Sequence, residues 1–361
     1  MTLVIEISHR FGDFAIEARF ESEGGLVALF GPSGSGKTTI VNAVAGLLRP
    51  DRGRVVIGGH VQMDSDRGIF LPRHRRRIGY VFQEGRLFPH LNVRQNLTYG
   101  QRFLPRGEAR PPLGPVAEML GIETLLDRHP LNLSGGEKAR VAIGRALLAA
   151  PHLLLMDEPF AALDEARKAE ILPYVERLRD EIRIPILYVS HQLTEIARLA
   201  DQVAVMDQGR LAAFGPPARI LSRIDLPGLT HRADAGAVIE TRIERHDHEF
   251  GLTRLKAGGG ASIAVPFLDR PPGAPIRLRI LARDVVIARG PLPEMSALNV
   301  LPCTIAEIGE FLGHEVDVVL DCGGDRIMAR ITRASSDRLG LVAGSPVFAI
   351  VKSVAFDRWT D

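Results

Sequence analysis

The sequence of 361 residues lacks three features that would each have defined its class. It has only two cysteines, Cys303 and Cys322, which exclude a disulfide scaffold; their spacing is too wide for a zinc or redox pair, so we expect both to be reduced and incidental. No apolar run approaches the roughly 18 residues of a membrane-spanning helix. The N-terminus has no signal-peptide pattern, because Glu6 interrupts its apolar start. We therefore expect a soluble, cytoplasmic protein.

An excess of charge of one sign is also absent. The 45 Lys and Arg residues against 43 Asp and Glu residues leave a net charge of +2, which gives no electrostatic case for binding nucleic acid or an anionic membrane. The densest basic cluster, residues 73–77, is short and is interpreted as a solvated face. Lysine is scarce, since 40 of the 45 basic residues are Arg. Compositional bias explains the scarcity, but a lysine can also mark a place that requires a compact ammonium. The five lysines are Lys37, Lys138, Lys168, Lys256 and Lys352.

The length predicts two or three domains. In residues 1–230, short apolar runs alternate with helix-length amphipathic stretches, which is typical of a mostly parallel sheet with helical crossovers. From residue 231 onward, turns rich in Gly and Pro separate short strands and predict a small β barrel, with two β-units joined near 290–295. The apolar runs of the first part are Leu26–Phe30, Leu153–Met156, Ile186–Val189 and Val203–Met206, and the longest amphipathic helix is expected over Glu165–Arg183.

A phosphate-binding loop follows the first of these runs. Its sequence matches G-x-x-x-x-G-K-[ST] and precedes an expected helix, Thr38–Leu48. Glycines let backbone N–H groups surround phosphate oxygens, and the helix N-terminus adds positive charge. Lys37 would reach the β- and γ-phosphates, and the Thr38 hydroxyl would ligate Mg²⁺. The loop residues are Gly31, Pro32, Ser33, Gly34, Ser35, Gly36, Lys37, Thr38 and Thr39.

Two carboxylates end a second buried run. Asp157 can hold the magnesium shell, and Glu158 is the natural group to orient and deprotonate the attacking water. No Asn-Lys-x-Asp motif is present, which counts against GTP. Phe11 or Phe14 could stack on adenine, although a core role suits each of them equally well.

Between the two phosphate motifs lies Leu-Ser-Gly-Gly, residues 133–136. With this signature the sequence resembles an ATP-binding-cassette (ABC) ATPase. Gln83, Asp164 and His191 match three further elements of that family, in the expected order. The resemblance implies that Gln83 links magnesium to a moving surface and that His191 contacts the γ-phosphate. It also implies that Ser134, Gly135 and Gly136 cap the γ-phosphate held by an opposite subunit, which gives a head-to-tail homodimer with two shared ATP molecules.

A further resemblance, carried by residues 86–100, 125–137 and 184–191, is to the ATPase of a molybdate importer. It implies an α/β P-loop NTPase cassette with a helical signature subdomain over residues 1–230. A β regulatory domain of OB-like barrel type would follow over 231–361, with a molybdate-binding-type (Mop/TOBE) unit at about 294–361. Leu298 stands where the family has an Arg, which removes a fork for a tetrahedral oxyanion. A weaker anion site is expected, or a domain that only packs or dimerises. The residues matched to that site are Ser296, Asn299, Lys352 and Ser353.

The resemblance implies the ATP-hydrolysing subunit of an importer, using ATP and Mg²⁺ and lying peripherally on the cytoplasmic face of the inner membrane. Its partners would be a second copy, two permease subunits and, indirectly, a periplasmic or extracellular oxyanion-binding protein, with molybdate at the C-terminal domain as a further ligand. The alternatives are an importer of sulfate, tungstate or another small solute, a soluble cassette acting on nucleic acid, and an oxyanion sensor or store. A single cassette, a near-neutral charge and no coiled-coil insertion count against nucleic acid, and the complete hydrolytic set counts against a mere sensor.

Overall fold

A computed structural model describes residues 2–182, 184–226, 228–229, 232–290, 294–353 and the backbone of 356–358. The chain divides into two compact units, Met1–Phe214 and Gly215–Asp361. The division precedes the boundary expected at residue 230, because helix α7 (Pro217–Ile220) packs against strand β12 (Gly236–Asp247) of the second unit. Within the described part of the chain, none of the helices is long and apolar enough to cross a membrane.

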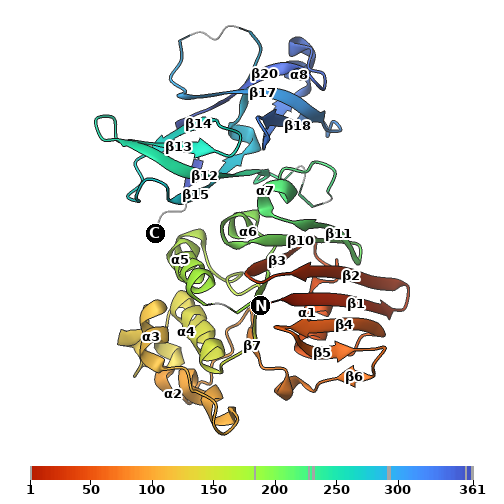
Figure 1. Cartoon of the computed structure of the whole chain (residues 1–361), viewed down its shortest axis with the longest axis vertical. Helices are drawn as coiled ribbons and strands as arrows, with labels where there is room; N and C mark the ends of the chain where they lie inside the picture. The colour runs from red at the N-terminus through yellow and green to blue at the C-terminus, as the bar shows by residue number, and fades with distance from the viewer. Residues whose placement is uncertain are drawn as a thin grey trace. The chain divides into compact units, whose positions relative to one another are not determined.

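An 11-stranded mixed sheet forms the first unit (Figure 1). The predicted parallel sheet is present in five neighbouring strands, in the order β10-β3-β9-β8-β7. The strands β6, β5, β4, β1 and β2 instead pair antiparallel. Short turns connect β1 to β2, β4 to β5 and β5 to β6, which leaves no room for a crossover, whereas β4 pairs with β1 after the intervening β3–α1 segment. The parallel strands are β10 (Gln202–Asp207), β3 (Leu26–Phe30), β9 (Ile186–Val189), β8 (Leu153–Asp157) and β7 (Ile78–Val81). The remaining strands are β6 (Ile69–Phe70), β5 (His60–Asp64), β4 (Arg52–Ile57), β1 (Leu3–Phe11), β2 (Phe14–Ser22) and β11 (Arg210–Gly215).

The apolar runs predicted as strands are confirmed. Strands β3 and β9 are buried along their whole length, as expected for parallel strands that are covered on both faces. Helix α1 (Lys37–Ala45) lies in the same core, with Ile40, Val41 and Val44 fully buried. It ends before the predicted Leu48, because Gly46 adopts a left-handed conformation with φ of 76° and caps the helix.

Arg76 corrects the interpretation of the basic cluster 73–77 as a solvated face. Its side chain is completely buried. The guanidinium donates hydrogen bonds of 2.7 and 2.8 Å to the carbonyls of Ala43 and Val44, in the last turn of α1. A cation at a helix C-terminus satisfies free carbonyls and interacts favourably with the helix dipole. Arg76 therefore fixes the helix whose other end carries the phosphate loop.

Most helices of the first unit lie on the side of the parallel strands, whereas α1 lies beside β1 and β4 (Figure 1) and shares a core with them. Helices α2 and α3 pack on α4, which forms the helical part around the Leu-Ser-Gly-Gly signature. The helix predicted over Glu165–Arg183 is confirmed as α5, and Arg183 lies outside the described residues. These helices are α2 (Val93–Thr98), α3 (Leu113–Met119), α4 (Gly135–Leu148), α5 (Glu165–Glu181) and α6 (Leu193–Leu199).

Two five-stranded antiparallel sheets form the second unit, in the orders β14-β13-β12-β15-β21 and β16-β20-β17-β18-β19. Their inner faces share one apolar core, so they are not two independent β-units. Strand β16 precedes residue 290 yet joins the second sheet, and β21 returns to the first. Besides α7, the unit has one α-helix among its described residues, α8 (Arg333–Leu339). The strands are β12 (given above), β13 (Leu252–Ala257), β14 (Ser262–Pro266), β15 (Pro275–Leu281), β16 (Val286–Ala288), β17 (Asn299–Ile308), β18 (Glu315–Cys322), β19 (Asp325–Thr332), β20 (Pro346–Val351) and β21 (Phe356–Arg358).

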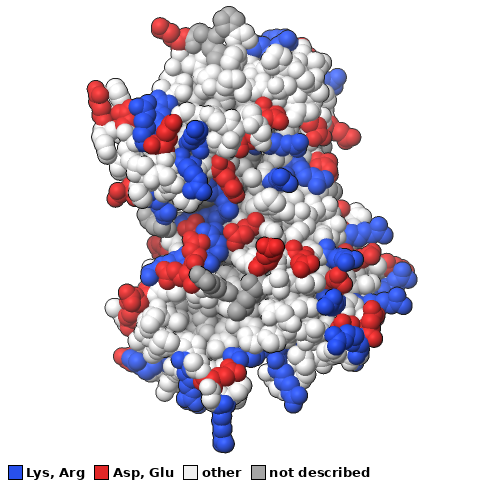
Figure 2. Space-filling view, in the orientation of Figure 1, with Lys and Arg blue, Asp and Glu red and all other residues white. Residues whose placement is uncertain are grey.

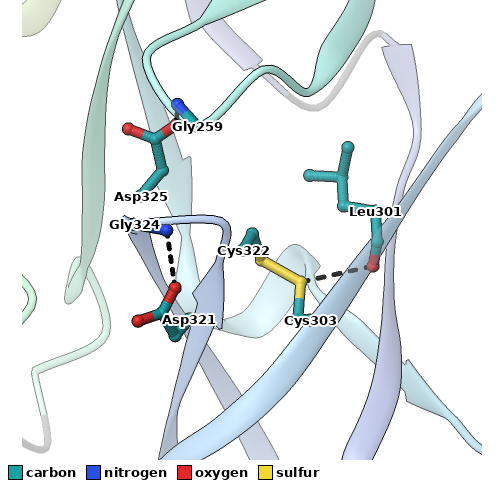
Figure 3. Close-up of a disulfide and its surroundings, with 7 residues drawn as sticks. All are labelled: Gly259, Leu301, Cys303, Asp321, Cys322, Gly324 and Asp325. Carbon is teal, nitrogen blue, oxygen red and sulfur yellow. Dashed lines mark hydrogen bonds between the residues drawn. A yellow bond between two sulfur atoms is a disulfide. The ribbon is translucent and has the colours of Figure 1, made fainter.

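A disulfide joins Cys303 to Cys322, so the expectation of two reduced, incidental cysteines is wrong (Figure 3). Strands β17 and β18 are antiparallel neighbours, and Thr304 pairs with Asp321. This register places the two cysteines opposite each other with their Cα atoms 4.2 Å apart, although 19 positions separate them in the sequence. Both side chains are buried in the shared core. The disulfide therefore joins β17 to β18 from inside the core that the two sheets share.

The disulfide leads to a stability prediction. In the unreduced, denatured protein we expect no free thiol. Reduction should lower the free energy of unfolding of the second unit by about 3 kcal/mol, because a closed loop of about 20 residues is released in the unfolded chain. Denaturant titration with and without reductant measures this. The Cys303→Ala/Cys322→Ala variant is the control and should not respond to reductant. Titration of two thiols in the unreduced parent would contradict the assignment.

Candidate nucleotide-binding site

The candidate site lies at the carboxyl ends of three neighbouring parallel strands, β3, β9 and β8. The phosphate loop follows β3, His191 follows β9, and Asp157 with Glu158 ends β8. These loops surround a cavity of about 580 Å³. Its lining residues are Phe14, Ser33, Gly34, Gly36, Lys37, Thr38, Thr39, Gln83, Asp157, Glu158, Val189 and His191. The phosphate loop, Gln83, the paired carboxylates and His191, four separate sequence motifs, thus meet at one edge of the sheet.

The phosphate loop depends on glycine at two tight positions. Gly31 has a φ of 150°, and a Cβ there would lie 2.1 Å from the Met206 carbonyl oxygen. Gly36 has a φ of 102° and packs against Ile16. Gly36 is the N-cap residue of helix α1 and has no side chain to cap it, and the first turn of α1 contains no acidic residue. The positive end of α1 therefore faces the cavity, which suits an anion such as phosphate.

Lys37 is the cation of this cavity. Its ammonium is largely buried and donates hydrogen bonds of 2.7 and 2.8 Å to the carbonyls of Gly31 and Pro32. Burial lowers the pKa of Lys37, while Glu158 and Asp157 act in the opposite direction. The Ser35 hydroxyl oxygen is buried and finds no hydrogen-bond partner among the described residues. The loop thus holds an ammonium and an unsatisfied hydroxyl where an anionic ligand would supply acceptors.

Asp157 has a partner that the sequence did not reveal. The Tyr80 hydroxyl, from β7, donates a 3.0 Å hydrogen bond to the Asp157 Oδ2 atom. Burial raises the pKa of Asp157, while this hydrogen bond and Lys37 lower it. The Tyr80 ring stacks on Phe82 with centroids 4.0 Å apart, next to Gln83. Only the pairing of β7 with β8 could have identified Tyr80, since the two positions are 77 residues apart.

Glu158 and His191 face each other across the ends of β8 and β9. The Glu158 Oε1 atom lies 3.4 Å from the His191 Nδ1 atom. Glu158 has a positive φ of 46°, and its backbone N–H donates to the Val189 carbonyl. A non-glycine residue with positive φ is uncommon, and such conformations concentrate at functional sites. Its neighbours hold Glu158 in this conformation, with its carboxylate at the cavity wall.

The donors around the cavity fit a magnesium ion bound together with phosphates. The Thr38 hydroxyl, the Asp157 carboxylate and the Gln83 amide are oxygen donors, and Mg²⁺ prefers oxygen and takes few protein ligands when phosphates complete its shell. In the described part of the chain, no group of three or more His, Cys, Asp or Glu side chains could hold a metal by itself. The donor set therefore suits magnesium delivered with a nucleotide.

Other predicted site residues lie outside this cavity. Phe14 is among its lining residues and Phe11 is not; Phe11 instead packs on the His9 ring with centroids 4.3 Å apart. Ser134 caps α4 in a reciprocal capping box with Glu137, and Asp164 caps α5 through the Arg167 N–H. The residues outside the lining are Gly31, Pro32, Ser35, Phe11, Ser134, Gly135, Gly136 and Asp164.

The candidate anion residues of the second unit are only partly together. Asn299 is buried; its side-chain oxygen accepts a hydrogen bond from the Ala264 N–H, and its amide donates to the Ala264 carbonyl and, at 3.4 Å, to the Ser353 hydroxyl. These bonds tie β14 to β17, so the Asn299 amide is committed to joining the two sheets. Ser296 and Lys352 are exposed. Leu298, in place of the family Arg, is 52% exposed.

Comparison with known proteins gives two family matches and several similar chains. The ABC transporter family matches residues 20–161, and the TOBE domain family matches residues 295–356. The chain is 56% identical to the molybdenum import ATP-binding protein ModC of Mesorhizobium japonicum, over 99% of this chain and 96% of that one. It is also 56% identical to ModC of Rhizobium meliloti, over 99% and 100% of the two chains. A solved bacterial Atm1-family ABC exporter with ATP bound is 30% identical with a TM-score of 0.51, covering 62% of this chain and 40% of that one.

The raised pKa of Asp157 predicts how replacing this residue affects stability. A carboxyl whose folded pKa lies above its unfolded value keeps its proton longer in the folded state, so its ionisation destabilises the fold as the pH rises. In nucleotide-free, magnesium-free protein, Asp157→Asn should therefore raise the free energy of unfolding at pH 7, and the gain should shrink as the pH falls toward 4. Denaturant titrations at several pH values measure this. A gain that grew on acidification would contradict it.

Proposed function

Because this chain belongs to the ATP-binding proteins of ABC transporters, in the group of molybdenum import proteins, we propose that it is the ATP-hydrolysing subunit of a molybdate importer. Two curated relatives, 56% identical over nearly the full length, are molybdenum import ATP-binding proteins. The proposed ATP hydrolysis rests on one observation: a cavity is lined together by the phosphate loop, Gln83, Asp157, Glu158 and His191. This set supplies a phosphate cradle, a metal shell and a base.

In this site each side chain has one task in hydrolysis. Lys37 and the N-terminus of α1 hold the phosphate oxygens. Glu158 orients the attacking water and accepts its proton. The water oxygen then forms the O–P bond to the γ-phosphorus as the bond from that phosphorus to the leaving ADP oxygen breaks. His191, 3.4 Å from Glu158, contacts the γ-phosphate. Magnesium, held by Thr38, Asp157 and Gln83, would neutralise charge on the β- and γ-oxygens when bound.

The protein acts as a head-to-tail homodimer with two shared ATP sites. Support comes from Ser134, Gly135 and Gly136, which lie at the N-terminus of α4 and outside the cavity of their own chain. A helix N-terminus attracts anions, and the capping box at α4 binds the N–H groups of Ser134 and Glu137 but not those of Gly135 and Gly136. In the dimer it closes on the γ-phosphate held by the other subunit, and Asp164 lies near that contact at the start of α5.

The dimer drives two copies of a membrane permease from the cytoplasmic face of the inner membrane, and it meets a periplasmic or extracellular oxyanion-binding protein only through that permease. The missing membrane-spanning helix among the described residues is consistent with a peripheral subunit. Acidic and basic side chains are interspersed over the visible face of each unit (Figure 2), which does not favour a role on nucleic acid.

The second unit responds to the transported anion. The match of residues 295–356 to a TOBE domain and the proximity of Asn299 to Ser353 support this role. Lys352 supplies the positive charge, and without the family Arg at position 298 the site is weak. Molybdate is the preferred ligand. Tungstate and sulfate have the same charge and tetrahedral shape, so they are the competing cargoes.

The general-base assignment predicts the behaviour of Glu158→Gln. Turnover should fall on the order of a hundredfold or more, because the base that accepts the water proton is lost. ATP binding should persist, because the phosphate cradle is unchanged, and an ATP-bound dimer should accumulate. Steady-state ATPase assays and light scattering of the variant with ATP and Mg²⁺ measure both effects. Hydrolysis by the variant at the parental rate would show that Glu158 is not the base.

The anion assignment predicts a ligand effect on the second unit. Molybdate at about a hundred times its dissociation constant should stabilise that unit by roughly 2.7 kcal/mol. Lys352→Met should weaken the effect, since it removes the cation. Thermal melting of the full chain with molybdate, tungstate or sulfate measures it, and Lys256→Met serves as a control for loss of a positive charge elsewhere in the unit. Equal melting with and without every anion would show that the unit only packs or dimerises.

A further inference from the structure

A buried ion pair joins two helices of the first unit close to the candidate site. Lys168, on α5, is 3% exposed, and its ammonium lies 3.6 Å from the Oε1 atom of Glu195 on α6. Glu195 is 4% exposed. The ammonium also donates a 3.1 Å hydrogen bond to Glu165, which is largely exposed. Removing two charges from water is costly unless each of them is well paired. The hydrogen-bond partners of Lys168 and Glu195 show which segments of the unit the ion pair holds in place.

The carboxylate of Glu195 is bonded to the segment that carries His191. Its Oε2 atom accepts hydrogen bonds from the Tyr188 hydroxyl, at 2.7 Å, and from the Ser190 hydroxyl, at 2.6 Å. The Ser190 oxygen in turn accepts a 3.0 Å hydrogen bond from the Gln192 N–H. Glu195 thus bonds Ser190, the residue before His191, directly, and Gln192, the residue after it, through the Ser190 hydroxyl. The carboxylate fixes this turn in the conformation that brings the imidazole to 3.4 Å from Glu158.

The other partner of the pair lies at the start of α5. The Lys168 N–H donates a 3.0 Å hydrogen bond to the Asp164 carbonyl, which is the first helical bond after the capping residue. Asp164 therefore lies one turn from the buried ammonium. A displacement of the start of α5 would be carried by Lys168 to Glu195, and from there to the turn around His191.

We propose that the Lys168–Glu195 ion pair positions His191 in the nucleotide site and links its placement to the start of α5. Both residues act through His191 and touch no substrate, so they are positioning residues. The inference rests on the proposed ATPase function, and it assigns a role to a lysine that no sequence motif explained.

The same two helices offer a matched control. Arg198, on α6, forms a bidentate ion pair with Glu176, on α5, through bonds of 2.9 and 2.8 Å. This pair is also mostly buried, and it is separate from the hydrogen bonds that Glu195 accepts from Tyr188 and Ser190. Breaking it removes an α5–α6 ion pair without altering the bonds around His191. A role of Lys168–Glu195 in holding the helices together would therefore be reproduced by Glu176→Gln, whereas a positioning role would not.

The experiment compares Lys168→Met, Glu195→Gln, the Lys168→Met/Glu195→Gln double variant, Lys168→Arg and Glu176→Gln in the full chain. The double variant carries no unpaired buried charge, which keeps the test available should a single variant fold poorly. The first measurement is the imidazole ¹H–¹³C signal of His191 in nucleotide-free protein, assigned with His191→Gln. The second separates kcat for ATP from the dissociation constant of ATP, and melting temperatures are recorded for every variant.

We expect the His191 signal to move in Lys168→Met, Glu195→Gln and the double variant, and to stay in place in Glu176→Gln. The kcat should fall between about tenfold and a hundredfold in the first three variants, because a catalytic group is misplaced, while the ATP dissociation constant changes little. Lys168→Arg keeps the charge and should restore most of the kcat. In the double variant the loss should be smaller than the product of the single losses, because the two residues form one interaction.

The proposal would be overturned if the His191 signal and kcat were unchanged in Lys168→Met and Glu195→Gln, or if Glu176→Gln changed both to the same extent. Failure of the proposed function itself would look different. In that case the parent chain would not hydrolyse ATP, or Glu158→Gln would hydrolyse it at the parental rate, whereas the His191 signal would still report whether the ion pair fixes the turn.

Discussion

The whole site depends on the adjacency of three parallel strands, β3, β9 and β8. Parallel strands end at the same edge of a sheet, so the loops that follow them meet there even though more than a hundred residues separate the phosphate loop from Asp157 and His191. Strands β3 and β9 are buried along their whole length, which fixes their register. The loops that follow them therefore start at fixed positions on this edge. Arg76 holds the far end of α1, so that the positive end of this helix faces the cavity.

This edge concentrates groups that are costly in the folded state. The Lys37 ammonium is largely buried, the Asp157 carboxylate is partly buried, and Glu158 has a positive φ. Burial at such a site is compensated by specific partners, namely Tyr80 for Asp157 and the Lys168–Glu195 pair for the turn around His191. The arrangement fits catalysis, in which preorganised charges stabilise the transition state without reorganising when it forms. The burial of apolar side chains in the cores of the two units offsets the free-energy cost of these groups.

Much of this arrangement could be predicted from the sequence, because motifs with fixed spacing and buried apolar runs are local signals. The phosphate loop, the paired carboxylates and strands such as Ile186–Val189 were recognisable in this way. What could not be predicted depends on pairing between distant segments. The Cys303–Cys322 disulfide follows from the register of β17 and β18, and Tyr80 reaches Asp157 only because β7 pairs with β8. Arg76 looked like part of a solvated cluster, since its burial depends on where α1 ends. Lys168 had no motif, because its partner lies on another helix.

The central claim is that ATP hydrolysis at the β3–β9–β8 edge drives molybdate across a membrane. It is tested most directly by molybdate uptake into vesicles that contain the permease, with ATP supplied on the side where this chain binds. Uptake should require ATP and Mg²⁺, and it should be lost when Lys37→Ala removes the ammonium of the phosphate loop. Uptake at the parental rate with Lys37→Ala would contradict the account.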